Sequence, residues 1–132
     1  MQMKLELVPI PVSDVDRAKA FYVEKIGFHL DHDVQPGNGM RICQLTPPGS
    51  ACSILIGTGM AGVSDMQPGS HHGLHLVVAD AVKAREMLMS RGVQVGELVE
   101  YDQGIKSVSF SDPDGNSWLF QELPWRAAEF TE

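Results

Sequence analysis

Basic residues and long apolar runs are both scarce in this sequence. Ten Lys and Arg residues stand against 17 Asp and Glu, which leaves a formal net charge of -7. Nucleic-acid-binding domains need a basic surface for the phosphates, so the charge argues against a nucleic-acid partner. No apolar run approaches the roughly 18 residues of a membrane-spanning helix, and residues 1–7, with Lys4 and Glu6, lack the apolar core of a signal peptide. We expect a cytoplasmic protein without a nucleic-acid or membrane partner, in which the acidity serves solubility or a cationic ligand.

Cysteine is scarce as well. The two cysteines, Cys43 and Cys52, flank a proline-rich turn. The repeat described below places Cys43 closer to Ile54 than to Cys52. We therefore expect both cysteines to be small apolar residues rather than partners in a disulfide. The sequence also lacks a Ser/His/Asp set, a reactive cysteine setting and a phosphate-binding glycine loop. The usual motifs for nucleophilic catalysis and phosphate binding are therefore missing.

What the sequence does contain is an internal repeat with a period of about 66 residues. Residues 46–50 (TPPGS) and 112–116 (DPDGN) align proline on proline and glycine on glycine, and Val12-Ser13-Asp14 aligns with Val78-Ala79-Asp80. A long period that occurs only twice indicates a duplicated module rather than a short-repeat solenoid. We expect the functional site where the two modules meet.

Hydrophobic periodicity predicts the same β-α-β-β-β order in each module, and hence an α+β fold. In the first strand, Pro9 and Pro11 have no N–H to donate, so this strand is expected at an edge of its sheet. Trp118 and Phe120 share one face of the last strand, because successive side chains alternate. The predicted strands cover 7–12, 28–34, 40–45 and 52–56 in the first module and 73–78, 94–99, 106–110 and 117–123 in the second.

Each module has start and stop signals for one helix. Ser13 and Asp16 have the spacing of a capping box in the first module, and Asp80 is the expected cap in the second. Gly27 and Gly92 are the stop signals. We expect one domain over residues 1–132, made of module 1 (about 5–57), a linker (58–72), module 2 (about 73–123) and a C-terminal tail (124–132).

The run Ile10-Pro11-Val12-Ser13-Asp14, continuing into RAKAFY at 17–22 and Gly27-Phe28, together with DPDGN at 112–116, resembles the vicinal oxygen chelate superfamily. That superfamily includes glyoxalase I, extradiol dioxygenases and bleomycin-resistance proteins, and the resemblance covers roughly residues 5–123. It implies two tandem βαβββ modules whose curled mixed sheets form a cup-shaped cavity. The segment WLFQE at 118–122 looks like a glyoxalase-like branch usually left without an assigned reaction. Relatives are often dimers, so the resemblance also implies a homodimer, with modules paired within one chain or exchanged between chains.

The family's chemistry needs a divalent metal held by His and Glu side chains in the cup. Carried over by the resemblance, the four ligand positions are Leu7, Ser53, Gly73 and Leu119. None of them is a His, Glu or Asp, so the usual metal site is absent and no cofactor is expected.

A displaced divalent metal is the alternative. His71, His72 and His75 cluster at the start of the second module, and His75 could share a ligand set with Gln121 and Glu122. However, Glu122 alternates with Gln121 and points to the helix side, and His71 and His72 are interpreted as solvated loop residues. For His75 we weigh a hydrogen-bonded pocket-wall histidine against contact with an organic ligand.

The remaining cup candidates are apolar or weakly polar, which is the usual description of a small-molecule site. Arg41 is the one cation expected to reach the cup, and a solvated edge-strand arginine is the alternative. The predicted ligand-binding residues are Leu7, Arg41, Ser53, Leu55, Gly73, His75, Leu119 and Gln121.

These observations lead to a functional hypothesis: a glyoxalase/bleomycin-resistance-like protein that binds a small organic molecule in the inter-module cup without a metal. The alternative is a lyase or isomerase of the glyoxalase type, in which a displaced metal or His75 as general base carries the reaction. A structural or interaction module without a ligand is the third reading.

Overall fold

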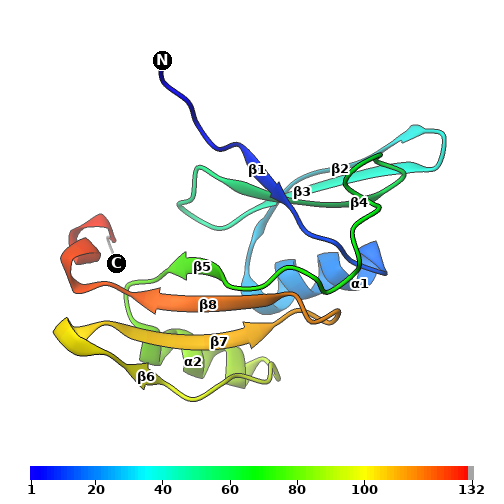
Figure 1. The fold of residues 1–132 in the computed structure, drawn as a ribbon. Helices are drawn as coiled ribbons and strands as arrows, with labels where there is room; N and C mark the ends of the chain where they lie inside the picture. Colours follow the sequence, from blue (N-terminus) through cyan, green and yellow to red (C-terminus); the bar gives the residue numbers. More distant parts are fainter. Residues whose placement is uncertain (131–132) are drawn as a thin grey trace. The chain divides into compact units, whose positions relative to one another are not determined.

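The computed structural model describes residues 1–130. These residues form two compact units. Unit 1 comprises Met1–His71 together with Asp112–Asn116, and unit 2 comprises His72–Ser111 together with the chain from Ser117 onward. Each unit contains one four-stranded sheet and one α-helix (Figure 1). The predicted fold class, α+β with two tandem βαβββ modules, is confirmed. Of the predicted tail 124–132, residues 131–132 lie outside the described part.

Unit 1 contains the first βαβββ module. Its sheet has the order β1-β4-β3-β2, with β1 parallel to β4 and the other pairs antiparallel. The strand β1 lies at an edge, as its prolines predicted, although it ends at Pro9 rather than at Val12. The elements are β1 (Leu7–Pro9), α1 (Val15–Ala20), a π-helical turn η1 (Phe21–Ile26), β2 (His29–Gly37), β3 (Met40–Thr46) and β4 (Ser53–Thr58).

The helix α1 begins one residue later than the capping box predicted. Asp14, not Ser13, is the N-cap, and its carboxylate accepts a hydrogen bond from the Arg17 backbone N–H at 3.0 Å. A carboxylate satisfies one of the free N–H groups of the first turn as a serine hydroxyl would. Ser13 is released from capping, and its hydroxyl donates to Asp114 instead, at 2.6 Å.

The end of this helix widens into η1 and stops at Gly27. Gly27 has φ +93°, a left-handed conformation that costs glycine little, and both Gly27 N and Phe28 N bond to the carbonyl of Tyr22. The wide turn buries Tyr22 completely and stacks its ring on Phe28.

Side-chain alternation divides the sheet of unit 1 into two faces. Ile54 and Ile56 on β4 and Cys43 and Leu45 on β3 are buried toward α1. The neighbouring residues on each strand therefore point to the opposite side. We call this side, in either unit, the open face of the sheet.

Unit 2 contains the second module. Its sheet has the order β5-β8-β7-β6, with β5 parallel to β8. Trp118 and Phe120 are buried on the helix side, as predicted, and Phe110 lies against both rings. Asp80 caps α2 through the Lys83 N–H, as predicted. The elements are β5 (Leu74–Val77), α2 (Ala81–Ser90), β6 (Val99–Glu100), η2 (Asp102–Gly104), β7 (Lys106–Ser111), β8 (Ser117–Glu122) and η3 (Pro124–Glu129).

The strand predicted over 94–99 is wrong for most of its length. Only Val99–Glu100 forms a strand, preceded by a single bridge from Val95 to Phe110. The Gly96 carbonyl accepts a hydrogen bond from Arg85 of α2 at 2.9 Å, which diverts it from sheet pairing. A Cβ on Gly96 would lie 2.4 Å from the hydroxyl oxygen of Ser109, so a larger residue there would require the Ser109 side chain to move.

The segment Asp112–Asn116, which joins β7 to β8 in sequence, packs with unit 1. The Tyr22 hydroxyl donates to Asp112 at 2.8 Å, and the Asn116 amide donates to the carbonyl of Pro11 at 2.8 Å. Asp112 and Asn116 are 5% and 0% exposed. We call this segment the buried turn. None of the helices within residues 1–130 has the length and apolarity needed to cross a membrane.

Candidate functional site

The open face of unit 2 brings together three of the predicted site residues. Strand pairing places His75 directly beside Leu119 and Val77 beside Gln121. Ser107 of β7 lies opposite Gln121 on the other side of β8. His75 is exposed, and Leu119 and Gln121 are partly exposed. The face therefore combines the apolar side chains of Leu119 and Val77 with an imidazole, an amide and serine hydroxyl groups, of which that of Ser107 is buried.

The imidazole of His75 is held by the backbone. Its Nδ1 lies 2.5 Å from the carbonyl oxygen of Gly73. A carbonyl can only accept, so Nδ1 carries the proton in this arrangement, and in the neutral ring Nε2 holds the lone pair. His75 thus presents an acceptor nitrogen while its ring orientation is fixed.

Gly73 does not occupy the place that the 66-residue shift predicted. In unit 1 Leu7 pairs with Ser53, whereas in unit 2 the neighbour of Leu119 is His75 and not Gly73. The chain between the first strand and the helix cap is two residues shorter in the second module, because β1 ends five residues before Asp14 and β5 three residues before Asp80. The repeat therefore slips by two residues, and a histidine stands beside Leu119.

The open face of unit 1 carries Leu7, Ser53 and Leu55. Ser53 is only 6% exposed, and its hydroxyl lies 2.6 Å from the hydroxyl of Thr46. Thr46 donates its single proton to Asp31, so Ser53 must donate to Thr46. This chain of hydrogen bonds fixes Ser53 and leaves its lone pairs as acceptors.

The same chain acts on Asp31. The hydroxyl of Thr46, and then the ring of His29 at 3.0 Å, lower the pKa of the Asp31 carboxyl below its usual value. Sequence reasoning missed Asp31, because the pairing of β2 with β3 is irregular between Leu30 and His32 and alternation alone does not assign its side.

Arg41 lies on the helix side of its strand, with Cys43. Its guanidinium donates two hydrogen bonds to Asp33, at 3.0 and 2.8 Å, and lies 2.9 Å from Asp16 of α1. Arg41, and then Lys19, hold the pKa of the Asp33 carboxyl far below its usual range, while hydrogen bonding by Asp33 raises the pKa of Arg41. Its charge is balanced by two carboxylates, and its part in ligand binding stays a prediction.

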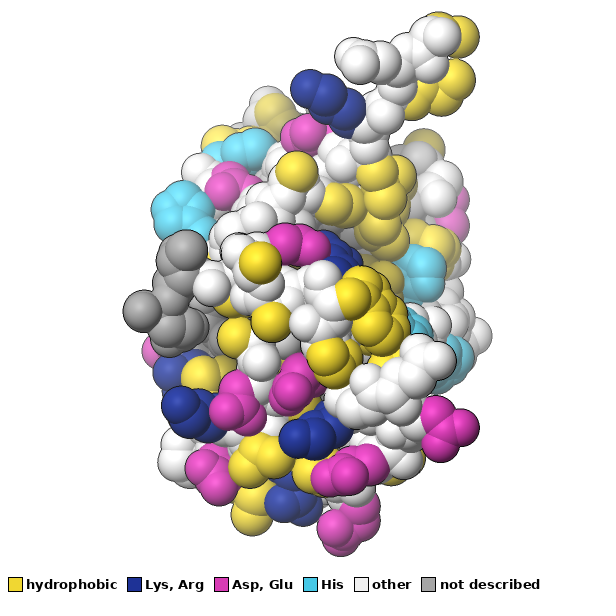
Figure 2. Space-filling view, turned by 90° about the vertical axis from the view of Figure 1, so that its left-hand side faces the viewer, with side chains coloured by type: hydrophobic (Ala, Val, Ile, Leu, Met, Phe, Trp, Pro, Cys, Tyr) yellow, Lys and Arg dark blue, Asp and Glu magenta, His cyan; other side chains and the backbone are white. Residues whose placement is uncertain are grey.

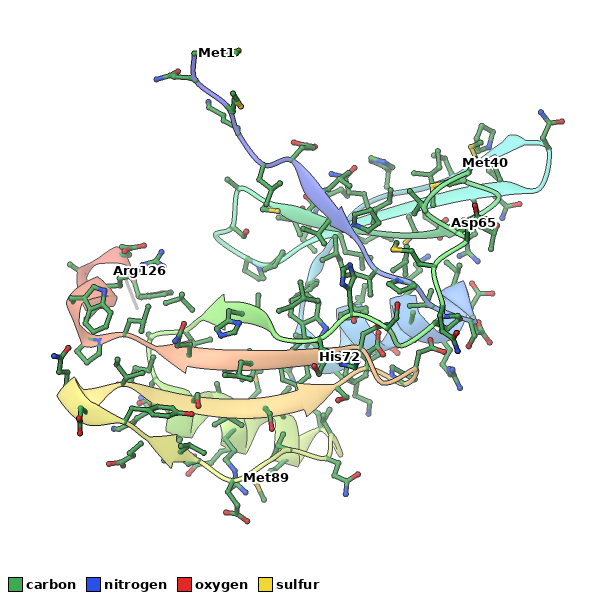
Figure 3. All side chains as sticks on the ribbon, viewed as in Figure 1. Met1, Met40, Asp65, His72, Met89 and Arg126 are labelled. Atoms are coloured by element: carbon green, nitrogen blue, oxygen red, sulfur yellow. The ribbon has the colours of Figure 1, made fainter. Side chains whose placement is uncertain are left out.

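A hollow of about 500 Å³ opens beside Arg41 within unit 1. It lies between the start of α1, the β2–β3 turn near Met40 and Thr58 at the end of β4 (Figure 3). The sequence predicts only a turn over residues 35–39, and no pattern in it indicates a concave wall. Its polar side chains are those of Ser13, Asp14, Gln35, Arg41 and Thr58.

The remaining candidate metal ligands have structural partners. The backbone N–H of His71 donates to Asn116, the ring of His72 lies 3.3 Å from the Ser117 hydroxyl, and Glu122 accepts from the Ala81 N–H at the start of α2. Among residues 1–130, no three His, Cys, Asp or Glu side chains are arranged to hold a metal ion.

Both cysteines are free, as predicted. Cys43 is fully buried, and burial raises the pKa of its thiol to about 11. A thiol in such surroundings stays protonated at neutral pH and acts as an apolar side chain.

Comparison with known proteins agrees with this description. The family model described as "Glyoxalase/Bleomycin resistance protein/Dioxygenase superfamily" matches residues 4–120. The structure of TnmS3, an antibiotic binding protein from Streptomyces sp. CB03234, is 36% identical, with a TM-score of 0.79 over 92% of this chain and 96% of that chain.

Two further structures are similar. A glyoxalase/bleomycin resistance protein from the same Streptomyces strain is 38% identical, with a TM-score of 0.75 over 89% of this chain and 98% of that chain. A member of the superfamily from Sphaerobacter thermophilus DSM 20745 is 30% identical, with a TM-score of 0.80 over 92% and 98% of the two chains. The chain belongs to the glyoxalase/bleomycin resistance protein/dioxygenase superfamily.

Proposed function

We propose that the protein binds a small organic molecule on the open faces of its sheets, without a metal. The observation that carries this proposal is the composition of the open face of unit 2. Leu119 supplies apolar area there, and His75, Gln121 and Ser107 supply a few hydrogen-bonding groups. Small-molecule sites combine apolar walls with a few orienting polar groups. The similarity to an antibiotic binding protein supports the same ligand class.

Each unit has a distinct part in this proposal. In unit 2, Leu119 contacts the ligand through apolar surface, while Nε2 of His75 accepts a hydrogen bond from it. By itself, the open face of unit 1 offers groups of the same kinds: Leu7 and Leu55 supply apolar area, and the oriented hydroxyl oxygen of Ser53 is an acceptor. A ligand with hydroxyl or N–H donors on an apolar frame fits these groups best.

Isothermal titration calorimetry tests the proposal with metal-free bleomycin and doxorubicin as probes, in buffer containing EDTA. We expect saturable binding that EDTA does not weaken. Leu119→Asp places a charge against the ligand and should weaken binding at least about tenfold, since desolvating an unpaired carboxylate is costly. Met89→Asp, at a 52% exposed position on α2, is the control. Equal affinities for the two variants would contradict the proposed site.

The fixed tautomer of His75 favours one alternative, a lyase or isomerase of the glyoxalase type. An exposed imidazole with its Nε2 lone pair available can act as a general base. Turnover of the adduct of methylglyoxal and glutathione is the assay, with and without nickel, zinc, manganese or iron(II). Turnover that His75→Gln abolishes would support catalysis. Turnover unchanged in His75→Gln would remove the general-base role.

A further inference from the structure

The structure brings together a serine and a histidine that lie 45 residues apart in the sequence. The Nδ1 atom of His72 lies 3.3 Å from the hydroxyl oxygen of Ser117. His72, labelled in Figure 3, is exposed just before β5, and Ser117 is the partly exposed first residue of β8. Both residues belong to unit 2. No sequence motif links the two positions, so the sequence did not predict this Ser/His pair.

The hydroxyl group of Ser117 has a defined direction. Its oxygen accepts a hydrogen bond from the Gly73 backbone N–H at 3.0 Å. A hydroxyl carries one proton, and among residues 1–130 the acceptor within reach of that proton is Nδ1 of His72. Ser117 therefore donates to Nδ1, and the proton of the neutral ring is on Nε2. An imidazole that accepts from a hydroxyl group is placed to act as its general base.

The backbone at Gly73 holds this pair and leaves space beside it. Its N–H donates to Ser117 and its carbonyl accepts from Nδ1 of His75, so both polar groups of the glycine are fixed. Its φ of +76° is a left-handed conformation that favours glycine, and no atom of the described chain lies within 4 Å of where a Cβ would stand. The N–H also stabilises the negative charge that develops on the Ser117 oxygen when it loses its proton.

The surroundings of Ser117 suit an ester substrate. The buried Trp118 points to the helix side of β8, so its neighbours Ser117 and Leu119 point to the open face. Ser111 of β7 lies directly opposite Ser117, and its hydroxyl has no hydrogen-bond partner in the described part of the chain. This hydroxyl can donate to the carbonyl oxygen of an acyl group at Ser117. Leu119 offers apolar surface for the rest of the molecule.

We propose that Ser117 is a nucleophile, that His72 is its general base, and that the pair hydrolyses activated esters. The Ser117 oxygen attacks the acyl carbon while its proton passes to His72, and the ester C–O bond breaks as the leaving alcohol takes that proton. Water then attacks the acyl-serine, again with His72 as the base, which releases the acid and restores the serine. The sum is ester plus water to acid plus alcohol. This activity goes beyond the ligand binding proposed above and does not depend on it, since a protein that binds neither bleomycin nor doxorubicin would still react.

Labelling with diisopropyl fluorophosphate is the first test. The nucleophile forms a bond to phosphorus and fluoride leaves with the proton, so intact mass counts the adducts and peptide mapping locates them. We expect about one adduct per chain, on Ser117. Ser109→Ala removes a serine of the same face that has no hydrogen bond to a histidine, and it should leave labelling unchanged. A wild type that stays unlabelled, an adduct on another residue in place of Ser117, or equal losses in Ser109→Ala and Ser117→Ala would overturn the proposal.

His72→Gln tests the general base separately from the position of the serine. The glutamine carbonyl can still accept a hydrogen bond from Ser117, but it does not take up the proton at neutral pH. We expect labelling to slow about 100-fold. The unfolding temperature should stay unchanged, because His72 is exposed. Labelling at the wild-type rate would remove His72 as the base and overturn the proposal.

Turnover of 4-nitrophenyl acetate distinguishes an acyl-serine from general catalysis by surface groups. Histidine side chains reach the surface at several points (cyan in Figure 2), and imidazole groups can attack such an ester directly. We expect a burst of about one nitrophenolate per chain, followed by slower deacylation. His32→Gln, at an exposed position of β2, is the matched control and should keep the burst that His72→Gln loses. Absence of the burst from the wild type, or its equal loss in both variants, would contradict the proposal.

Discussion

The two turns that align in the repeat have come to differ in their surroundings. The buried turn, Asp112–Asn116, is held by Tyr22, Pro11 and other groups of unit 1. Its counterpart at 46–50, which we call the exposed turn, is closed by a local bond from Ser50 N to the Pro47 carbonyl, and its Thr46 hydroxyl donates to Asp31 of the neighbouring strand. Ser50 is exposed where Asn116 is fully buried.

This difference shows how a duplicated loop can become part of a core. Every buried side-chain nitrogen and oxygen atom of the buried turn has a hydrogen-bond partner within residues 1–130. A fully satisfied buried polar network specifies one arrangement, and removal of one member leaves the others unpaired. The exposed turn keeps access to water, which can replace any bond it loses.

The largest contrast is expected between Asn116→Ala and Ser50→Ala. The Asn116 side chain donates to the Pro11 carbonyl and to Asp112 and accepts from the His71 backbone N–H, so its removal takes one hydrogen bond from each of three groups. We expect a loss of about 3–4 kcal/mol in unfolding free energy. Ser50→Ala should cost under about 0.5 kcal/mol, because Ser50 is exposed. Urea unfolding measures both, and equal losses would break the comparison.

The glycines near the two turns give a second contrast. Gly69 and Gly49 have φ of +80° and +84°, so alanine is strained at both. A Cβ on Gly69 would also lie 2.1 Å from the Asp114 carbonyl oxygen, whereas nothing lies within 4 Å at Gly49. We expect Gly49→Ala to cost about 1 kcal/mol and Gly69→Ala about 3 kcal/mol by urea denaturation. A difference near zero would mean that the buried turn moves aside freely.

Tyr22→Phe is a smaller change that probes one bond of the buried turn. It removes the hydroxyl donor to Asp112 but keeps the ring that stacks on Phe28. Because Asp112 keeps its bonds to Asp114 N and Asn116, we expect a loss of about 1–2 kcal/mol. Phe21, on the same helical turn, is the control position through Phe21→Leu. A loss below that of the control would mean that water replaces the hydroxyl.

The smallest effect is expected at Thr46, the first residue of the exposed turn. Its hydroxyl lowers the pKa of Asp31, so this contribution is present above the ordinary carboxyl pKa and is lost as pH falls through the folded-state value. Thr46→Val should cost about 0.5–1 kcal/mol at pH 7, since Asp31 is partly exposed. The cost should shrink below about pH 4. Unfolding curves from pH 7 to 3 measure it, and a cost independent of pH would exclude the Asp31 bond as its source.

The sequence was sufficient for the features that depend on local periodicity. Alternation placed Trp118 and Phe120 in the core, and Asp80 was identified as a cap from its position alone. It failed where distant groups decide the local structure. The Gly96 carbonyl bonds to Arg85, and Ser13 donates to Asp114, 101 residues later in the chain, instead of capping the helix. Neither partner can be found from neighbouring residues.

The candidate site was predictable to a similar extent. Parity placed His75, Leu119 and Gln121 on one face, and the pairing of β5 with β8 agrees. The two-residue slip that puts His75 beside Leu119 depends on the length of the strand-to-helix connection, which the aligned motifs do not record. The partners of Arg41 were missed because the side of the sheet that it occupies is set by the register of β3 with its neighbours.

Unit 1 is built from two separate stretches of the chain, and this affects when it can fold during synthesis. A ribosome releases residues 1–71 first, including Gly69, whose N–H donates to the Pro11 carbonyl, but the second donor to that carbonyl is residue 116. Until that residue emerges, Tyr22 and Pro11 lack their native hydrogen-bond partners in the turn. The first module therefore cannot complete its native core while the second is still being translated, although its own helix and strands are already made.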